Sequence, residues 1–248
     1  MRRLIRFFQV TTVSMALTVA ATLALAHPGL VAIDVGHTRH APGAISARGV
    51  AEFEFNRTLA NALDEALASE PGLQPVIINA PDFALGLTAR VARAKALGAV
   101  LFVSIHHDSV QPSYLTPVHQ AGRIHHVSRY ASGYSLFVSQ RQACCPVGSR
   151  HLAERLGEAL QVAGYQASGH HAEDIPGERR RWIDPALGIY RFDGLAVLRQ
   201  AAMPAVLIEA GVIVHPEQEV ELASAAGQRR MARALAAGII AWWRETRD

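Results

Sequence analysis

Four titratable side chains stand where apolar segments of the sequence end or where a helix is expected to begin. His37 and His106 each close an apolar run, Glu209 directly follows another, and Glu52 falls in the first turn of a helical pattern. Two neutral imidazoles and one carboxylate suit zinc, and a three-ligand set leaves the fourth position open for water. A second carboxylate nearby could take a proton from that water and pass it to a leaving amine. These residue types therefore indicate metal-assisted amide hydrolysis.

Each of these groups also has an ordinary interpretation. A histidine at a strand end is often only solvated, and a glutamate in a first helical turn is stabilised by the helix dipole. Glu209 is harder to explain in this way, because an acid placed directly after four apolar residues must be exposed, paired or functional. The sequence contains no Gly-x-Ser-x-Gly motif, so nucleophilic catalysis is the weaker interpretation.

Short apolar runs predict the strands that position these groups, at residues 30–37, 74–79, 99–107 and 204–211. The runs are continuously apolar rather than alternating, which is typical of strands covered on both faces. Amphipathic helical patterns occur at residues 51–69, 87–98, 149–164 and about 217–243. The alternation predicts a single α/β domain. In such sheets ligands bind outside the carboxyl ends of the strands, where His37, His106 and Glu209 are expected to lie.

Motifs around these residues, in the same order along the chain, resemble those of a known family. They read AIDVGHTRHAPGA (32–44), GVAEFEFN (49–56), LTARVARAKALGAVLFVSIHHDS (87–109) and LAVLRQAAMPAVLIEAGVI (195–213). In them the chain resembles the zinc-dependent N-acetylmuramoyl-L-alanine amidases of the bacterial cell wall, of the Amidase_3 type. Each motif alone is weak, but their common order over nearly the whole chain after the first 26 residues makes the resemblance specific.

This resemblance implies a role for each of the four residues. His37, Glu52 and His106 match zinc ligands and Glu209 matches the catalytic acid/base, so Zn²⁺ is the implied cofactor. The implied reaction cleaves the amide that joins the lactyl group of N-acetylmuramic acid to the L-alanine of the peptidoglycan stem peptide. The implied fold is a twisted, mostly parallel sheet with helices on both faces, in agreement with the pattern of runs and helices.

Two neighbouring residues compete with these assignments. Glu54 lies two residues after Glu52, about 200° round the helix, so only one of them can face the site. The motif register favours Glu52. Side chains alternate across a strand, so the adjacent His106 and His107 cannot both face one site while the strand continues. His106 takes the metal position in the motif, and His107 is expected to point elsewhere or to line the pocket.

Some positions depart from the family pattern. Val35 stands where proline is usual, His107 and Asp108 replace a small residue and an asparagine, and Val212 replaces an aromatic residue. None of these departures removes a ligand or the catalytic acid. They bear on the shape of the substrate groove.

Other polar residues are expected to have structural or solvent-exposed roles. Arg90 matches a family arginine, and on a helix we expect it to be a structural ion-pair partner. Cys144 and Cys145 are adjacent, and they form either a strained vicinal disulfide or two unpaired loop thiols. The spans 110–130 and 170–194 lack a clear period, and we expect solvated side chains at the histidines in them: His119, His125, His126, His170 and His171.

The first 26 residues predict a secretory signal peptide. Arg2, Arg3 and Arg6 precede an apolar stretch that ends in Ala24-Leu25-Ala26, which is a small-x-small cleavage site. These three arginines account for the formal net charge of +3, so residues 27–248 are formally neutral and no nucleic-acid partner is expected. We expect residues 27–248 to form the zinc amidase catalytic domain, without a membrane span, exported to the periplasm or cell envelope.

Two rival functions stay open at this point. A zinc peptidase that cuts within the stem peptide would use the same ligands, and a wall-binding or regulatory protein could keep the fold without turnover. Peptidoglycan is the expected substrate, and a protein activator is possible. In some family members an inserted segment blocks the zinc until a partner removes it, and the span 170–194 is a candidate for such a segment.

Overall fold

The structure, a computed structural model, describes residues 28–79, 85–120 and 122–247. The predicted signal peptide lies outside these residues. The strands are β1 (Gly29–Val35), β2 (Leu73–Ile77), β3 (Leu101–Asp108), β4 (Thr116–Gln120), β5 (Arg123–Val127), β6 (Ser135–Val138), β7 (Arg181–Asp184), β8 (Ile189–Arg191) and β9 (Ala205–Val212). The α-helices are α1 (Glu52–Ala68), α2 (Leu87–Ala96), α3 (Pro146–Val162), α4 (Ala196–Gln200), α5 (Pro216–Ala223) and α6 (Ala225–Glu245). Two short 3₁₀ turns occur at η1 (Pro112–Tyr114) and η2 (His170–Ala172).

The main sheet has seven strands in the order β2-β1-β3-β9-β6-β8-β7. Its first four strands are mutually parallel and are those predicted from the apolar runs. β6 runs antiparallel to β9, β8 is parallel to β6, and β7 is antiparallel to β8. The predicted α/β class with a mostly parallel sheet is therefore confirmed. The apolar runs do not predict β6, β7 and β8, because each has only three or four residues.

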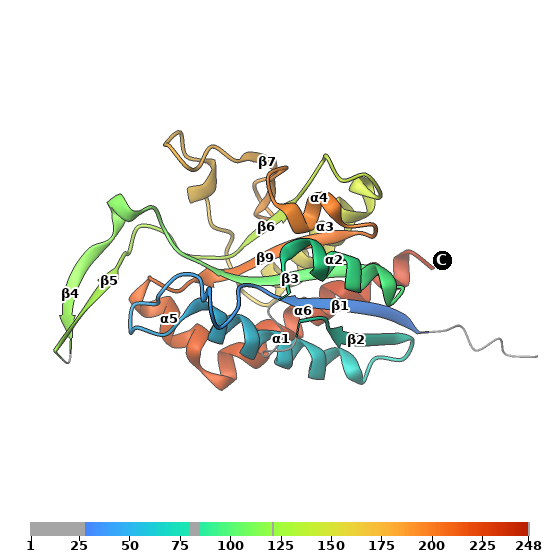
Figure 1. Cartoon of the computed structure of the whole chain (residues 1–248), viewed down its shortest axis with the longest axis horizontal. Coiled ribbons are helices and arrows are strands. Elements are labelled where there is room, and N and C mark those ends of the chain that lie inside the picture. Colours follow the sequence, from blue (N-terminus) through green and yellow to red (C-terminus); the bar gives the residue numbers. More distant parts are fainter. Residues whose placement is uncertain (1–27, 80–84, 121, 248) are drawn as a thin grey trace, which may run out of the picture.

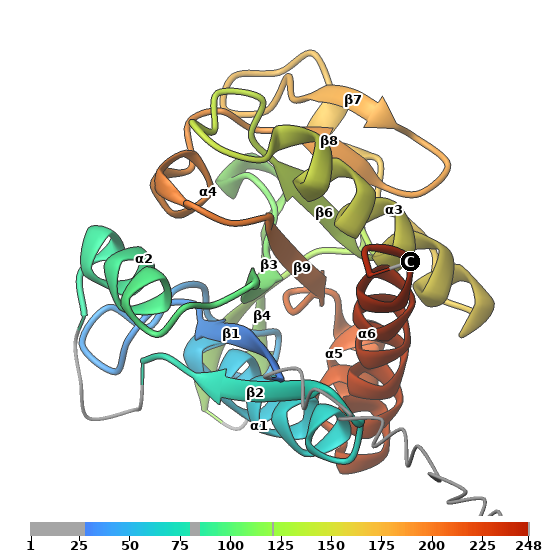
Figure 2. The ribbon, with the colours of Figure 1, turned by 90° about the vertical axis from the view of Figure 1, so that its right-hand side faces the viewer.

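Helices cover both faces of this sheet (Figure 1 and Figure 2). The larger core lies between the sheet and α1, α3 and α6, and it includes Leu59, Val103 and Leu235. The smaller core lies under α2 and α4 on the opposite face, with Phe102 and other buried apolar residues. Burial on both faces explains why the parallel strands are continuously apolar.

The structure corrects the prediction of one C-terminal helix. Residues 217–243 belong to two helices, α5 and α6, which are separated at Ser224. Ser224 has an extended backbone, and its hydroxyl accepts a hydrogen bond from the Gly227 amide at 2.9 Å. This is an N-cap, which satisfies a free amide at the start of α6 and so favours a new helix there.

The two spans without a clear period contain regular structure. Residues 110–130 include the antiparallel β4–β5 hairpin, which projects from the body of the molecule (Figure 1). Residues 170–194 include β7 and β8, which belong to the main sheet, with β7 at its edge, so these two strands are not a separate lid. Among the helices that the structure describes, none is both long enough and apolar enough to cross a membrane.

Candidate active site

His37 stands at the carboxyl end of β1, immediately after Gly36. A Cβ on Gly36 would overlap the His106 imidazole, so the glycine allows that ring to approach the β1 backbone. His37 has a φ of 66°, in the left-handed region that non-glycine residues rarely adopt. Its carbonyl accepts a hydrogen bond of 2.7 Å from the Arg90 guanidinium, which helps to hold this backbone conformation.

Glu52 begins α1 and is buried, with 4% of its surface exposed. The loop before the helix folds round its carboxylate, and the Ala44 amide donates a hydrogen bond to Oε2 at 3.1 Å. A Cβ on Gly43 would overlap the same oxygen, and Gly43 has a φ of +79°. Only glycine fits this close approach and this conformation.

The three predicted ligands lie together. Glu52 Oε2 is 3.0 Å from His37 Nε2, and Glu52 Oε1 is 3.1 Å from His106 Nδ1. The two imidazole rings meet edge to face with centroids 5.0 Å apart. One potential ligand atom from each of the three residues lies within 4.8 Å of the others. We call this set, His37, Glu52 and His106, the first cluster.

Charge pairing dominates the electrostatics of the first cluster. The hydrogen bond and charge of Glu52 raise the pKa of His37, although burial opposes the shift. Burial alone would raise the pKa of Glu52, but hydrogen bonds from His106 and His37 hold it well below its ordinary value. A buried, ionised carboxylate between two imidazole nitrogens is a donor set that fits a divalent cation such as zinc.

Two neighbours of the first cluster behave as predicted. Glu54 turns away from the site and pairs with Arg57 at 2.7 Å, so Glu52 is the acid that faces the histidines. His107 is buried, and its Nδ1 lies 2.8 Å from Oδ1 of Asn56. Burial lowers the pKa of His107 to about 3, so this imidazole is neutral.

Asn56 and Arg90 hold the residues of the first cluster in place by hydrogen bonds. The Asn56 amide nitrogen donates to Glu52 Oε1 at 3.1 Å and to the Gly36 carbonyl at 3.2 Å. Arg90 is 3% exposed and forms a buried ion pair with Asp34 at 3.1 Å. The predicted ion pair of Arg90 is therefore present, with Asp34 as its partner.

Glu209 lies on β9 directly across from His106 in the parallel register. Its Oε2 atom is buried and has no hydrogen-bond partner among the described residues. Burial raises the pKa of Glu209 well above its ordinary value, and the carboxylates of Asp108 and Glu52 raise it further. A carboxyl group whose pKa is raised holds a proton more readily than an ordinary carboxylate, which suits a group that must both accept and donate one.

A cavity of about 370 Å³ opens at the first cluster. His37 and His106 contribute to its wall, and Leu87, Leu195 and Val197 supply much of the apolar lining. The ligand nitrogens therefore border a space in which a substrate group could bind.

The structure overturns the expectation for one histidine pair. His170 and His171 are 6% and 9% exposed, and both contact Asp108. We call Asp108, His170 and His171 the second cluster. Two signals in the sequence point to it, namely the adjacent histidines and the acid that replaces the usual asparagine, but no periodicity indicates that they meet. His119 and His126 are exposed on the β4–β5 hairpin, as expected, and His125 is half-buried.

The adjacent cysteines lie immediately before α3. Cys144 and Cys145 are joined in a disulfide bond, which decides between the two alternatives that the sequence leaves open. Neither cysteine belongs to either cluster.

Comparison with known proteins identifies the family. Residues 31–241 match the Amidase_3 family, described as N-acetylmuramoyl-L-alanine amidase. The chain belongs to this amidase family. Its match spans all seven strands of the sheet except the first two residues of β1, and both clusters lie within it.

Curated relatives of the amidase family share about a quarter of the sequence. The chain is 23% identical over 244 residues to N-acetylmuramoyl-L-alanine amidase AmiC of Escherichia coli O6:H1, covering 87% of this chain and 53% of AmiC. It is 25% identical over 236 residues to AmiA of Escherichia coli K12, covering 86% of this chain and 76% of AmiA. The chain thus spans only about half of the length of the AmiC relative.

A solved structure agrees with the fold. The N-acetylmuramyl-L-alanine amidase Ami1 of Mycobacterium smegmatis superposes with a TM-score of 0.70 at 20% identity, covering 88% of this chain and 98% of that chain. The expected amidase fold is therefore confirmed.

Proposed function

We propose that this chain is a zinc-dependent peptidoglycan hydrolase that cleaves the amide between N-acetylmuramic acid and the L-alanine of the stem peptide. The observation that carries the proposal is the convergence of His37, Glu52 and His106 beside an unpartnered Glu209 carboxyl group. The family match supports the choice of substrate and bond.

The first cluster is the proposed zinc site. His37 Nε2, a carboxylate oxygen of Glu52 and His106 Nδ1 would hold the ion, and three protein ligands leave a position open to the cavity. When bound, zinc polarises the scissile carbonyl and makes a water molecule more acidic. Asn56 and the Ala44 amide keep the Glu52 carboxylate in place by hydrogen bonds to its two oxygens.

Glu209 is the proposed acid/base. It stands across from His106 in the sheet, so its carboxyl group reaches the same end of the strands as the ligands. In the proposed reaction it takes a proton from the attacking water and then gives a proton to the leaving amine nitrogen of L-alanine. The carbon–nitrogen bond breaks as that nitrogen is protonated, which yields a free lactyl carboxylate and a free peptide.

The cellular setting is also part of the proposal. The signal-like first 26 residues and a peptidoglycan substrate are both consistent with export to the periplasm or cell envelope. Residues 27–248 would then be the catalytic domain. A protein activator stays a prediction, and the part of residues 170–194 that precedes β7 is the remaining candidate for a regulatory segment.

Digestion of purified peptidoglycan tests the proposal. The zinc-loaded protein is incubated with intact sacculi, with and without a chelator, and the soluble products are identified by mass. We expect stem peptides with a free L-alanine amino terminus and glycan strands that have lost their peptides, and we expect chelation to abolish both.

Other products would overturn the proposal. Cuts inside the stem peptide would identify a peptidase instead. Binding to sacculi without any soluble product, equal for wild type and Glu209→Gln in the presence of zinc, would support a wall-binding protein. A parallel reaction contains a soluble extract of the source cells, which supplies any activator. The extract without the protein is the blank, because it measures hydrolysis by other enzymes of the extract.

A further inference from the structure

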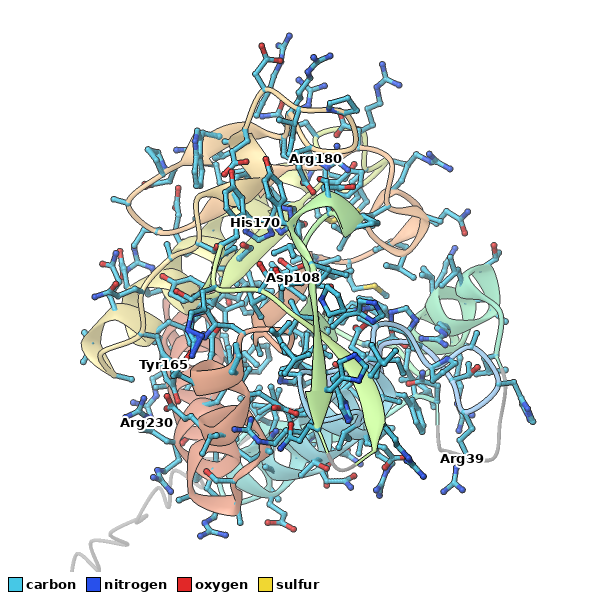
Figure 3. The ribbon with its side chains drawn as sticks, turned by 90° about the vertical axis from the view of Figure 1, so that its left-hand side faces the viewer. Arg39, Asp108, Tyr165, His170, Arg180 and Arg230 are labelled. Atoms are coloured by element: carbon cyan, nitrogen blue, oxygen red, sulfur yellow. A yellow bond between two sulfur atoms is a disulfide. The ribbon has the colours of Figure 1, made fainter. Side chains whose placement is uncertain are left out.

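The second cluster brings three potential metal ligands together at the carboxyl end of β3. Asp108 Oδ2 lies 2.7 Å from His171 Nε2 and 3.1 Å from His170 Nε2. One ligand atom from each residue lies within 4.8 Å of the others, as in the first cluster. Figure 3 shows Asp108 and His170 next to one another, where the strand meets the segment that leads to β7. The second cluster thus has the same ligand types as the first, two imidazoles and one carboxylate.

Both imidazoles are held by their outer nitrogens. His170 Nδ1 lies 2.8 Å from the Ser168 hydroxyl, and His171 Nδ1 lies 2.9 Å from Glu178 Oε2. Gln111 donates to the other oxygen of Glu178 at 2.6 Å, which orients that carboxylate. Histidines that bind metals usually have this arrangement, with one nitrogen on the ion and the other hydrogen-bonded to an oxygen.

The inner nitrogens of the two imidazoles differ: His171 Nε2 is hydrogen-bonded to Asp108 Oδ2 at 2.7 Å, whereas His170 Nε2 is not. His170 Nε2 is shielded from solvent and makes no hydrogen bond among the described residues, although it faces Asp108. The His171 ring packs edge-on against Phe137, with centroids 4.9 Å apart. A buried polar atom without a partner costs free energy, so a ligand that satisfies it is expected.

A metal-free interpretation explains only part of this geometry. A protonated His171 could bridge the carboxylates of Asp108 and Glu178, with one nitrogen on each. That ion pair leaves His170 Nε2 with only its 3.1 Å contact to Asp108 Oδ2, which lacks hydrogen-bond geometry. A cation between Asp108 and the two imidazoles satisfies both inner nitrogens and still leaves Glu178 to orient His171. In the described part of the chain, no lysine or arginine forms an ion pair with Asp108.

We propose that Asp108, His170 and His171 form a second metal site, separate from the first cluster, for a divalent transition metal of the zinc type. Imidazole nitrogens and a carboxylate favour such ions over magnesium or calcium, which prefer oxygen ligands. The bound ion links the segment between Ser168 and Glu178 to the end of β3, two residues after His106. The site is therefore placed to fix that segment beside the proposed catalytic centre.

Zinc stoichiometry at equilibrium tests this site without any measurement of activity. The purified full chain is stripped of metal, dialysed against buffered free zinc, and analysed for bound zinc per chain. The variants are His170→Gln with His171→Gln, Asp108→Asn, and His37→Gln with His106→Gln. The matched control is His125→Gln with His126→Gln, which changes another adjacent histidine pair outside both clusters. Circular dichroism verifies that each variant is folded.

We expect two zinc ions per wild-type chain and per control chain. The His170/His171 variant and Asp108→Asn should each lose one ion, and the His37/His106 variant should lose the other. The second site is refuted if wild type and the folded His170/His171 variant bind the same amount of zinc. If the His37/His106 variant keeps both zinc ions while the His170/His171 variant loses one, the first site is refuted and the second is supported. The two proposals can therefore be tested separately. Asp108→Asn keeps the size of the side chain, and it decides the result if the double variant does not fold.

Discussion

The two histidine–carboxylate clusters share β3 but are built from different kinds of structure. In the first cluster the carboxylate of Glu52 lies between two histidines near the carboxyl ends of the neighbouring parallel strands β1 and β3, and the buried Arg90 donates a hydrogen bond to the His37 carbonyl. In the second cluster the carboxylate ends β3, and both histidines come from a single 3₁₀ turn in a long connection. Hydrogen bonds to the Ser168 hydroxyl and the Glu178 carboxylate orient this pair, and Gln111 donates to Glu178 in turn; no buried arginine side chain contacts the pair in the part of the chain that the structure describes.

This difference suggests a catalytic role for the first cluster and a structural role for the second. His37 and His106 of the first cluster line the cavity of about 370 Å³, whereas none of the three residues of the second cluster does. A ligand set on rigid strand ends holds a reacting group in a fixed geometry, and a set on a connecting segment can instead fasten that segment. We therefore expect changes at the first cluster to affect turnover most, and changes at the second to affect metal content and the adjacent segment.

The largest effect is expected at Glu209. Glu209→Gln keeps the size of the side chain but cannot exchange a proton, so amide hydrolysis should fall by about 10²- to 10⁴-fold. Zinc content should not change, because Glu209 is not a proposed ligand. Release of stem peptides from sacculi measures the loss, and Glu54→Gln on the outer side of α1 is the control. Full activity in Glu209→Gln would contradict the role of acid/base.

Arg90 tests the support of the first cluster. Arg90→Leu leaves the buried Asp34 carboxylate without its partner, so the free energy of unfolding should drop by about 3–5 kcal/mol. Denaturant unfolding measures this drop. Arg93→Leu, at an exposed position on the same helix, should change stability by less than about 0.5 kcal/mol. Equal stabilities for the two variants would mean that the buried ion pair does not hold the β1 loop.

His107, next to the first cluster, makes the stability of the folded protein depend on pH. Its pKa in the folded protein is about 3, whereas an unfolded histidine titrates near 6.5. The unfolded state therefore binds more protons below pH 6.5, and stability falls as the pH drops towards 3. Between these two pKa values, His107 changes the free energy of unfolding by about 1.4 kcal/mol per pH unit. In zinc-free protein, His107→Gln should show a shallower acid loss than wild type, and parallel curves would exclude the effect.

Gln111 tests the support of the second cluster and is expected to have the smallest effect. Gln111→Ala removes one hydrogen bond to the partly buried Glu178 carboxylate, so stability should drop by about 1–2 kcal/mol. Zinc bound at the second cluster should weaken, while the hydrolysis rate with excess zinc should stay close to that of wild type. A loss of turnover as large as that of Glu209→Gln would remove the distinction between the clusters.

Much of the first cluster can be predicted because its residues lie at or near the ends of regular elements. The apolar runs that form β1, β3 and β9 place His37, His106 and Glu209 toward the same end of the parallel strands. The helical register then separates Glu52 from Glu54. These signals are local. The motif resemblance then assigns the roles.

The second cluster could not be predicted, because its histidines lie in a segment without a period. The position of this segment depends on contacts that are distant in sequence, such as the Ser168 amide donating to the Tyr134 carbonyl at 2.8 Å. The same reason applies to β6 and β8, whose few residues pair with one another across a long stretch of sequence. Such elements carry too few residues for a periodic signal to appear.

A zinc-edge anomalous difference map from crystals of the zinc-loaded protein tests the proposed catalytic centre and the second site most directly. We expect one peak between His37, Glu52 and His106, next to Glu209, and a second between Asp108, His170 and His171. A map without a peak at the first cluster, in crystals that contain zinc elsewhere, would contradict the proposed catalytic centre.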